Sequence, residues 1–386
     1  MIYVGIDIAK HNHYCAITTD YGEVLYSPFL VKNDLASFKE LESILSQFEK
    51  TEILIGFEST AHYANNLSSY FSSRDFNCGI INPYRTAQLR KVLNPDTKND
   101  KVDSLLICQA LQMKLHTLVK YHLVMDELKG LCISYQNIMT SRSRSKIQLT
   151  TYVDRVFPEL ASFFKGNLHL KVSYELLKHY PLPSNISKAR IDTLTNLLST
   201  ASHGRYKADK AIFLKNLSKN SIGINSSSVG FQIQLAISQI ELYTNQLEEI
   251  KSRITAMMIE IDSPLLSIPG INTVMAAMIL SSIKDITLFS NWCKLCSFAG
   301  LNPKVIQSGL FSASTTRMSK RGSRMLRYAL IYSAHNVVKN NQTFKDYYTL
   351  KRSQGKSHYN ALGHCATKLI RIIYKLLNEN KKFDLA

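Results

Sequence analysis

The order of apolar segments in the first hundred residues places the tightest limit on the fold. Residues 2–9, 14–19 and 24–31 are typical of three consecutive strands joined by short polar turns. Apolar residues then recur at helical spacing between Leu35 and Phe48. Beyond this helix the pattern alternates between strand and helix, in the segments 53–57, 63–71, 78–82, 84–93 and 101–115. The sequence therefore predicts a mixed α/β domain built around one sheet.

This order is that of a ribonuclease-H-like (RuvC-like) domain, although other α/β folds share parts of it. Asp7 lies inside the first strand, where an unpaired buried charge costs several kcal/mol. Glu58 ends the fourth strand, and Asp100 and Asp103 share one face at the start of the last helix. Because these elements converge in such a domain, we expect the four side chains, here called the acidic tetrad, to form one cluster.

Four carboxylates remain ionised together only around divalent cations, typically two Mg²⁺ ions about 4 Å apart, with Mn²⁺ as an alternative. Such a pair orients the oxygens of a phosphodiester displacement. Ordinary roles exist for single members of the tetrad: Glu58 as a solvated loop charge and Asp100 as a helix N-cap. Neither role explains Asp7 or Asp103. Sugar kinases and actin-like ATPases also open with an Asp, but their second Gly-rich phosphate loop and adenosine-binding glycine pair are not found in this sequence.

The positive charge of the chain is concentrated near its C-terminus. Of a net +18, residues 301–386 contribute sixteen Lys/Arg against three Asp/Glu, which points to a polyanionic partner such as nucleic acid. A smaller basic run, Arg142, Arg144 and Lys146, is expected to face solvent or a nucleic-acid backbone. No apolar stretch reaches the roughly 18 residues of a membrane span, and the N-terminus has no signal-peptide pattern. With seven scattered cysteines, these features favour a cytoplasmic protein that has no membrane partner.

Beyond about Met125 the pattern becomes almost wholly helical. We predict a catalytic domain over 1–120, a helical domain over 121–262 with an insert at 159–228, and a mainly α-helical C-terminal domain over 263–386. Four heptads between Ile233 and Ile261 predict a coiled coil, paired either with 128–157 of the same chain or with another chain. The turn at 268–271 resembles a helix-hairpin-helix, in which Gly270 would approach a DNA phosphate; an ordinary helical hairpin is an equal alternative.

Several stretches, in order over nearly the whole chain, resemble the DEDD-type insertion-sequence transposases, whose relatives include the pilin-gene DNA invertases. They are GIDIAK, GFEST, INPYRTAQLRKVLNPDTKNDKVDSLLI, LLSIPGINTVMAAMIL, SFAGLNPKVIQSG and SKRGSRMLRYAL. By position, the resemblance assigns the acidic tetrad to the family's metal-binding and catalytic acids, and Ser308 to its catalytic serine. Without the resemblance, nothing in the residues selects Ser308 over Ser312, Ser314 or Ser319.

The resemblance implies recombination of double-stranded donor and target DNA by a transposase. Ser308 would attack a backbone phosphate and form a 5′-phosphoserine link, assisted by the acidic tetrad and Mg²⁺. It further implies homodimers, a tetrameric synapse with active sites shared between subunits, and guidance by a structured non-coding bridge RNA, in a bacterial or archaeal cytoplasm. Cations downstream of the serine are placed to stabilise phosphate charge: Arg317, Lys320, Arg321, Arg324 and Arg327. The alternative is a RuvC-like, Mg²⁺-dependent junction resolvase or nuclease in which water is the nucleophile.

Overall fold

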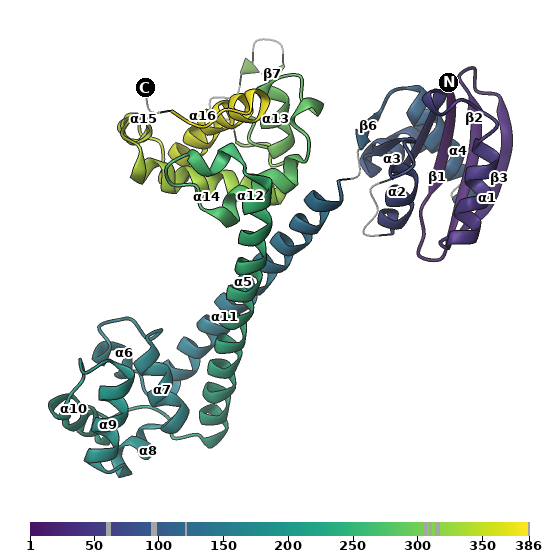
Figure 1. The fold of residues 1–386 in the computed structure, drawn as a ribbon. Helices are drawn as coiled ribbons and strands as arrows, with labels where there is room; N and C mark the ends of the chain where they lie inside the picture. Colours follow the sequence, from purple (N-terminus) through teal and green to yellow (C-terminus); the bar gives the residue numbers. More distant parts are fainter. Residues whose placement is uncertain are drawn as a thin grey trace. The chain divides into compact units, whose positions relative to one another are not determined.

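The structure, a computed structural model, describes residues 1–58, 63–93, 99–119, 122–303, 307–308, 311–312 and 317–384. The chain divides into two compact units, Met1–Asp126 and Glu127–Ala386 (Figure 1). This boundary lies close to the predicted end of the first domain at residue 120. The further division near residue 262 stays a prediction. No helix in the described ranges is both long enough and apolar enough to cross a membrane.

The first unit is built on a six-stranded sheet with the strand order β3-β2-β1-β4-β5-β6. β1 pairs antiparallel with β2 and parallel with β4, so the first and fourth strands end at the same edge. The five predicted strands are present to within two residues, whereas the short β6 was not predicted. The strands are β1 Ile2–Asp7, β2 Asn12–Thr19, β3 Val24–Lys32, β4 Ile53–Glu58, β5 Asn77–Ile81 and β6 His116–Val119.

Helices cover both faces of this sheet because successive strand residues point to opposite sides. On one face, Phe38 of α1 and Phe71 of α2 pack against strand residues such as Ile6. On the other, Ile107 and Leu111 of α4 pack with further strand residues. The helices of this unit are α1 Leu35–Leu45, the short η1 Lys50–Glu52, α2 Ala64–Ser72, α3 Pro83–Leu93 and α4 Asp100–Gln112.

Two paired glycines let α4 lie directly on the sheet. Gly5 of β1 and Gly56 of β4 are partners in the parallel register. A Cβ atom on Gly5 would lie 2.2 Å from the backbone oxygen of Ser104, and one on Gly56 would lie 2.5 Å from Leu111. The Cys108 thiol, in the same helix, donates to the backbone oxygen of Ala16 at 3.4 Å. The start of α4 is therefore held beside the ends of β1 and β4.

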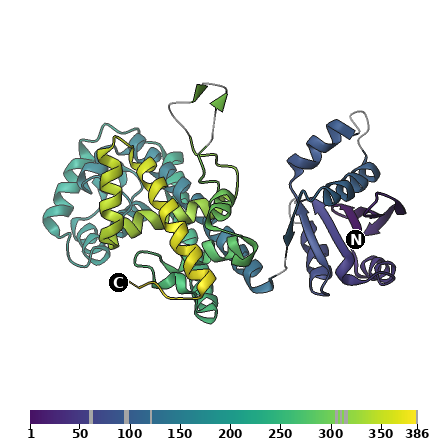
Figure 2. The same ribbon diagram turned by 90° about the horizontal axis from the view of Figure 1, so that it is seen from above.

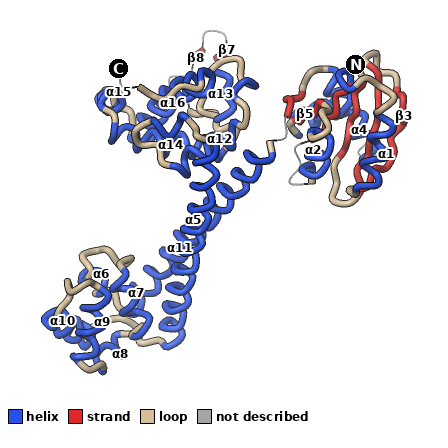
Figure 3. The backbone as a smooth tube through the Cα atoms, in the orientation of Figure 1, coloured by secondary structure: helices blue, strands red, loops and turns tan. Residues whose placement is uncertain are grey.

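The second unit is mainly helical (Figure 3). Its N-terminal half comprises α5 Leu123–Val156, α6 Leu160–Phe163, α7 Lys171–His179, α8 Pro183–Lys188, α9 Ile191–Ala201, α10 Ala208–Lys219 and α11 Ser227–Ile261. Its C-terminal half comprises η2 Pro264–Ser267, α12 Thr273–Ile283, η3 Ile286–Leu288, α13 Trp292–Ala299, β7 Gln307–Ser308, β8 Phe311–Ser312, α14 Arg324–Asn340, α15 Gln342–Ser353 and α16 His358–Glu379.

The long helices α5 and α11 pack against each other within one chain. Ser145 of α5 donates to the Gln239 side chain of α11 at 3.1 Å, and one core contains residues of both helices. Leu247 and Ile254, further along α11, are also buried in the single chain. The predicted insert is helical: α6–α10 share the core formed by the neighbouring ends of α5 and α11. A coiled coil between subunits stays a prediction.

We expect Gly5→Ala to lower the free energy of unfolding of the first unit by about 1–3 kcal/mol, because the added methyl overlaps the backbone of α4. Gly130→Ala is the matched control, since a Cβ there meets nothing within 4 Å. It lies inside α5, where Ala favours the helix by about 0.5–1 kcal/mol over Gly. Chemical denaturation followed by circular dichroism measures both variants. Equal stability of the two would contradict the close packing of α4 on β1.

Candidate active site

The backbone brings the acidic tetrad to one edge of the sheet. Asp7 is the last residue of β1 and Glu58 the last residue of the neighbouring parallel strand β4. Asp100 and Asp103 lie in the first turn of α4, which packs on these two strands. The helix is capped by Asn99, whose side chain accepts from the backbone N–H of Val102 at 2.8 Å. The ordinary interpretation of Asp100 as the N-cap is therefore wrong, and its carboxylate is not used for capping.

The four carboxylates influence one another electrostatically. Burial is the largest cause, followed by the negative charges of Asp103, Asp100 and Glu58, and together they raise the pKa of Asp7 from 3.8 to about 7. Arg90 acts in the opposite direction, by a smaller amount. Asp7 is half-buried, so these charges are only partly screened by solvent. Ionisation of Asp7 at the end of β1 therefore lowers the free energy of unfolding.

Two side chains of α3, which the sequence analysis missed, partner the tetrad. Arg90 holds Asp103 through Nη2 at 2.6 Å and through Nε at 3.0 Å. The Thr86 hydroxyl donates to Glu58 in a short hydrogen bond. Thr86 and Arg90 are four residues apart and so share one face of α3. This four-residue spacing, in the helix that precedes the two aspartates of the tetrad, is the sequence signal that could have identified Thr86 and Arg90.

The carboxylates are near one another without converging on a common point. Among the residues that the structure describes, no three His, Cys, Asp or Glu side chains are placed to hold one metal ion. The chemistry of the donor set nevertheless fits Mg²⁺ or Mn²⁺, which prefer carboxylate oxygens. Repulsion around Asp7 is also the condition that a divalent cation relieves. Arg90 contacts only Oδ1 of Asp103, and Thr86 contacts only Oε1 of Glu58, so these contacts leave the second oxygen of each carboxylate for a metal ion.

Ser308 lies in the second unit, whereas the acidic tetrad lies in the first. It ends β7 and pairs with Phe311 of β8, in a small hairpin that extends from the helices of its unit (Figure 2). An isolated antiparallel bridge also pairs Pro303 with Met318. Of the alternative serines, Ser312 lies in β8 and Ser314 lies outside the described residues. The Ser319 hydroxyl accepts from the backbone N–H of Arg321 at 3.1 Å, which gives it a structural role.

Comparison with known proteins decides the family. A family model of DEDD transposases of the IS110 type, described as "Transposase", matches residues 4–158. A second, described as "Transposase IS116/IS110/IS902 family", matches residues 262–349. The chain belongs to this transposase family. The first match includes the acidic tetrad and extends through α5, and the second includes Ser308.

Relatives extend over almost the whole transposase chain. The "Insertion element IS110 uncharacterized 43.6 kDa protein" of Streptomyces coelicolor is 21% identical over 99% of this chain and 95% of its own length. The corresponding protein of insertion element IS900 from Mycobacterium paratuberculosis is 22% identical over 100% of this chain and 98% of its own. The family assignment therefore covers both units.

The predicted cations of the C-terminal region differ in what they contact. Arg317, Lys320, Arg321 and Arg324 are exposed, as expected of groups that meet a polyanion. Arg327 is partly buried, and its guanidinium donates to the backbone oxygens of Ala299 at 3.0 Å and Lys320 at 3.1 Å. These bonds let the guanidinium of Arg327 hold two chain segments together, and its contact with nucleic acid stays a prediction.

The three cations of the basic run in α5 also differ in their exposure to solvent. Arg144 is exposed, whereas Arg142 and Lys146 are half-buried. Burial lowers the pKa of Lys146, and the neighbouring Arg142 charge lowers it further. Burial of Tyr174 in the insert raises the pKa of that phenol, and Arg142 opposes this increase, so Arg142 lies near α7. Arg144 is thus the most exposed of the three, and contact of this run with a nucleic-acid backbone stays a prediction.

Gly270 is required by packing within the chain. Its φ of +97° favours glycine, and a Cβ there would lie 2.8 Å from the backbone of Asn336 in α14. The segment before the turn is the four-residue η2, and the following α12 is buried along nearly its whole length. The close backbone approach that suggested a DNA phosphate is thus made to another helix, and the helix-hairpin-helix stays unsupported.

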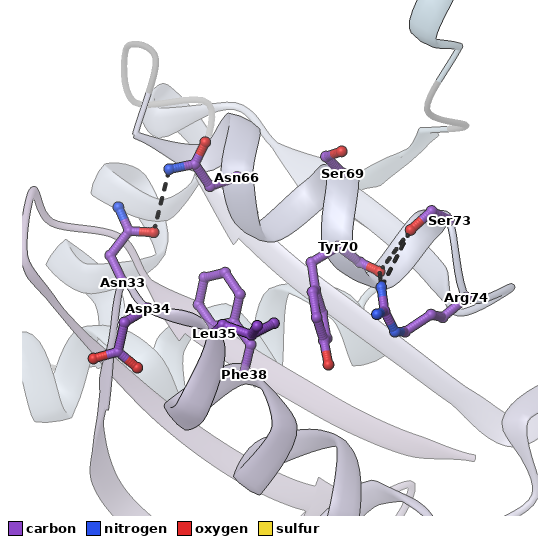
Figure 4. Close-up of a pocket in the computed structure, with 9 residues that line it drawn as sticks. All are labelled: Asn33, Asp34, Leu35, Phe38, Asn66, Ser69, Tyr70, Ser73 and Arg74. Atoms are coloured by element: carbon purple, nitrogen blue, oxygen red, sulfur yellow. Dashed lines mark hydrogen bonds between the residues drawn. The ribbon is translucent and has the colours of Figure 1, made fainter.

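A hollow of about 420 Å³ lies between α1 and α2, in the first unit (Figure 4). Its rim is closed by contacts among its own residues: Asn66 donates to Asn33, and the Arg74 guanidinium stacks 3.7 Å from the centre of the Tyr70 ring. Arg74 also pairs with Glu42 at 3.4 Å. Arg74 is thus paired with Glu42, and the Asp34 carboxylate caps α1 by accepting from the backbone N–H of Ser37 at 2.8 Å. Because both charged groups that line the hollow already have partners, the hollow is not a candidate site.

We expect Asp7→Asn to stabilise the metal-free protein at about pH 8 by roughly 1–2 kcal/mol. The folded-state pKa of Asp7 is about 7 and its ordinary value is 3.8. The ionised carboxylate therefore costs folding free energy that grows as pH rises between these values and is constant above them. Differential scanning calorimetry at several pH values, with chelator present, measures the difference from wild type, which should vanish near pH 4.

The exposed Asp154, for which the same substitution removes a solvated charge, provides the control. Adding Mg²⁺ should raise the melting temperature of the wild type more than that of Asp7→Asn. A variant that melts below the wild type at every pH would show that Asp7 stabilises the fold, contrary to the electrostatic argument.

Proposed function

We propose that this transposase cuts and rejoins double-stranded DNA by serine attack on a backbone phosphate, assisted by the acidic tetrad. One observation carries the proposal. Asp7 lies near enough to the three other carboxylates of the tetrad, at one sheet edge, for their charges to raise its pKa. Among ordinary structural roles, none requires four acids at one such place. Recombination of DNA strands is a reaction in which a carboxylate cluster of this kind has a use.

The chemical step that we propose conserves the energy of the phosphodiester. Ser308 Oγ forms a bond to phosphorus while the bond from phosphorus to the 3′ oxygen breaks. The proton lost by the serine hydroxyl is balanced by the proton gained by the released 3′-hydroxyl. The DNA 5′ end is then held as a phosphoserine ester, and reversal with another 3′-hydroxyl rejoins strands without ATP.

The acidic tetrad would hold Mg²⁺, which supplies positive charge near the reacting phosphate oxygens. Arg90 and Thr86 would hold Asp103 and Glu58 in place when the cation is absent, since each already bonds one of these carboxylates. The exposed cations at Arg317, Lys320, Arg321 and Arg324 would contact the phosphates that flank Ser308.

We further propose that active sites are shared between subunits of a dimer, with a tetrameric synapse for two DNA partners. The placement of the tetrad and Ser308 in different units is compatible with such sharing. A structured bridge RNA as guide is part of the same proposal, and the sixteen Lys/Arg of residues 301–386 suit both DNA and RNA. The competing function is hydrolysis by a junction resolvase or nuclease that uses the tetrad and water.

We expect each single variant of the tetrad to lose strand cleavage by on the order of a hundredfold or more, because one ligand charge is lost and the reacting oxygens are misplaced. The variants are Asp7→Asn, Glu58→Gln, Asp100→Asn and Asp103→Asn. Glu52→Gln is the matched control, because Glu52 is exposed and immediately precedes β4, which Glu58 ends. A plasmid recombination assay measures the loss. Near-normal recombination by two tetrad variants would exclude the metal-site assignment.

We expect Ser308→Ala to abolish both the covalent protein–DNA adduct and recombination. Binding of DNA and its salt dependence should stay near wild type, because a neutral hydroxyl neutralises no phosphate. Ser312→Ala, in the paired strand β8, is the control. A suicide substrate and denaturing gels detect the 5′-linked adduct. Normal cutting by Ser308→Ala, as a water-dependent nuclease would show, defeats the serine mechanism and leaves the tetrad proposal standing.

A further inference from the structure

The insert carries positive charge that the proposed active site does not use. Residues 159–228 contain ten Lys/Arg and four Asp/Glu. Arg205, Lys207 and Lys210, around the start of α10, are all exposed. The ion pairs formed by described residues of the insert involve other cations, Lys178 and Arg190. In the segment 202–213, Asp209 is the one acid. The local charge is therefore positive and largely uncompensated.

Aromatic rings lie directly beside these cations. Phe163 of α6 stacks on Phe213 of α10, with ring centres 6.1 Å apart and planes 15° apart. Phe163 also contacts Tyr206 at 5.7 Å, next to Arg205 and Lys207 in the chain. The Lys210 ammonium lies 6.0 Å from the centre of the Phe213 ring. We call these three rings, together with Lys210 and the two cations that flank Tyr206 in the chain, the aromatic-basic patch.

Phe213 contributes little to the core of the insert. Its side chain is 53% exposed, whereas Ala211 and Leu214, on the other face of α10, are fully buried. The ring is held in place by Phe163 but leaves more than half of its surface to water. Among the described residues, Arg205, Lys207 and Lys210 form no ion pair with a carboxylate. An exposed, oriented aromatic ring beside such cations suits a ligand that is both flat and anionic.

The start of α10 adds to the attraction for anions. The helix begins after Lys207 without a side-chain cap, so its first backbone N–H groups are left for water or an anion. Exposed rings beside cations are how proteins bind unpaired nucleic acid, since each base offers a face for stacking and each phosphate a charge. In a duplex the base faces are covered by their neighbours, and an acidic peptide would leave the ring uncovered.

We infer that the aromatic-basic patch of the insert binds an unpaired segment of nucleic acid, with a base stacked on Phe213 and phosphates at Arg205, Lys207 and Lys210. This site contains no member of the acidic tetrad and is separate in the chain from Ser308. Its test is a binding measurement without strand cleavage, so its outcome is independent of the proposed recombination mechanism.

Fluorescence anisotropy with the full chain tests the inference, using labelled oligouridine, oligothymidine and a duplex. Phe213→Leu should raise Kd for the unpaired probes at least about fivefold, and Phe213→Tyr should bind like wild type, because stacking requires a ring. Phe231→Leu is the matched control, since Phe231 is 60% exposed on α11. Replacing both Lys207 and Lys210 by Ala should reduce the slope of log Kd against log salt concentration by about 1.4, because two phosphate contacts are lost. Lys171→Ala on α7 is the control and should change this slope by no more than about 0.7.

Photo-cross-linking separates this patch from the basic C-terminal region. A bromouridine-labelled oligonucleotide, irradiated with the full chain and digested, should yield a cross-linked peptide from α10. Preference for RNA or for DNA identifies the source of the unpaired strand, and either agrees with the inference. Cross-links confined to residues 301–386, tighter binding of the duplex, or equal Kd values for Phe213→Leu and Phe231→Leu would overturn it. The inference would also be overturned if Phe213→Leu changed the oligomeric mass of the protein but left its Kd for the unpaired probes unchanged.

Discussion

The contact of α4 with β1 and β4 is the constraint on which the candidate active site depends. Gly5 and Gly56 lie side by side in the sheet, and any larger residue at Gly5 would collide with the backbone of α4. The helix can therefore lie flat against the strands with its first turn at their ends. Because Asp100 and Asp103 belong to that turn, two residues without side chains decide where two carboxylates are placed.

This arrangement gathers negative charge that the protein only partly compensates. Arg90 offsets one carboxylate and Thr86 hydrogen-bonds another, yet Asp7 keeps a pKa near 7 through burial and repulsion. A cluster maintained at such a cost is typical of a functional site, since folding stability alone would favour apolar residues there. The proposed Mg²⁺ would convert the same repulsion into attraction, which is why the metal-free and metal-bound proteins should differ in stability.

The positive charge of the chain is distributed over several surfaces with different physical roles. Arg327 is used inside the protein, where it binds backbone oxygens, and Arg142 and Lys146 lie half-buried on α5. The exposed cations near Ser308 and those of the aromatic-basic patch remain open to a partner. Net charge alone does not separate these groups. Under the proposals made above, nucleic acid would contact the protein both near Ser308 and at the aromatic-basic patch.

The sequence by itself predicted the first five strands with the helices between them, singled out the four acids as candidates, and indicated the family. Period-two and helical patterns report local burial, and ordered motifs are visible without coordinates. Only the tertiary structure decided the partners: Arg90 for Asp103, Asn336 behind Gly270, and Phe163 stacked on Phe213. It also added β6 and replaced Asp100 by Asn99 as the cap of α4. The physical reason is that a side chain's partner depends on residues brought close by packing, and local periodicity carries no record of that proximity.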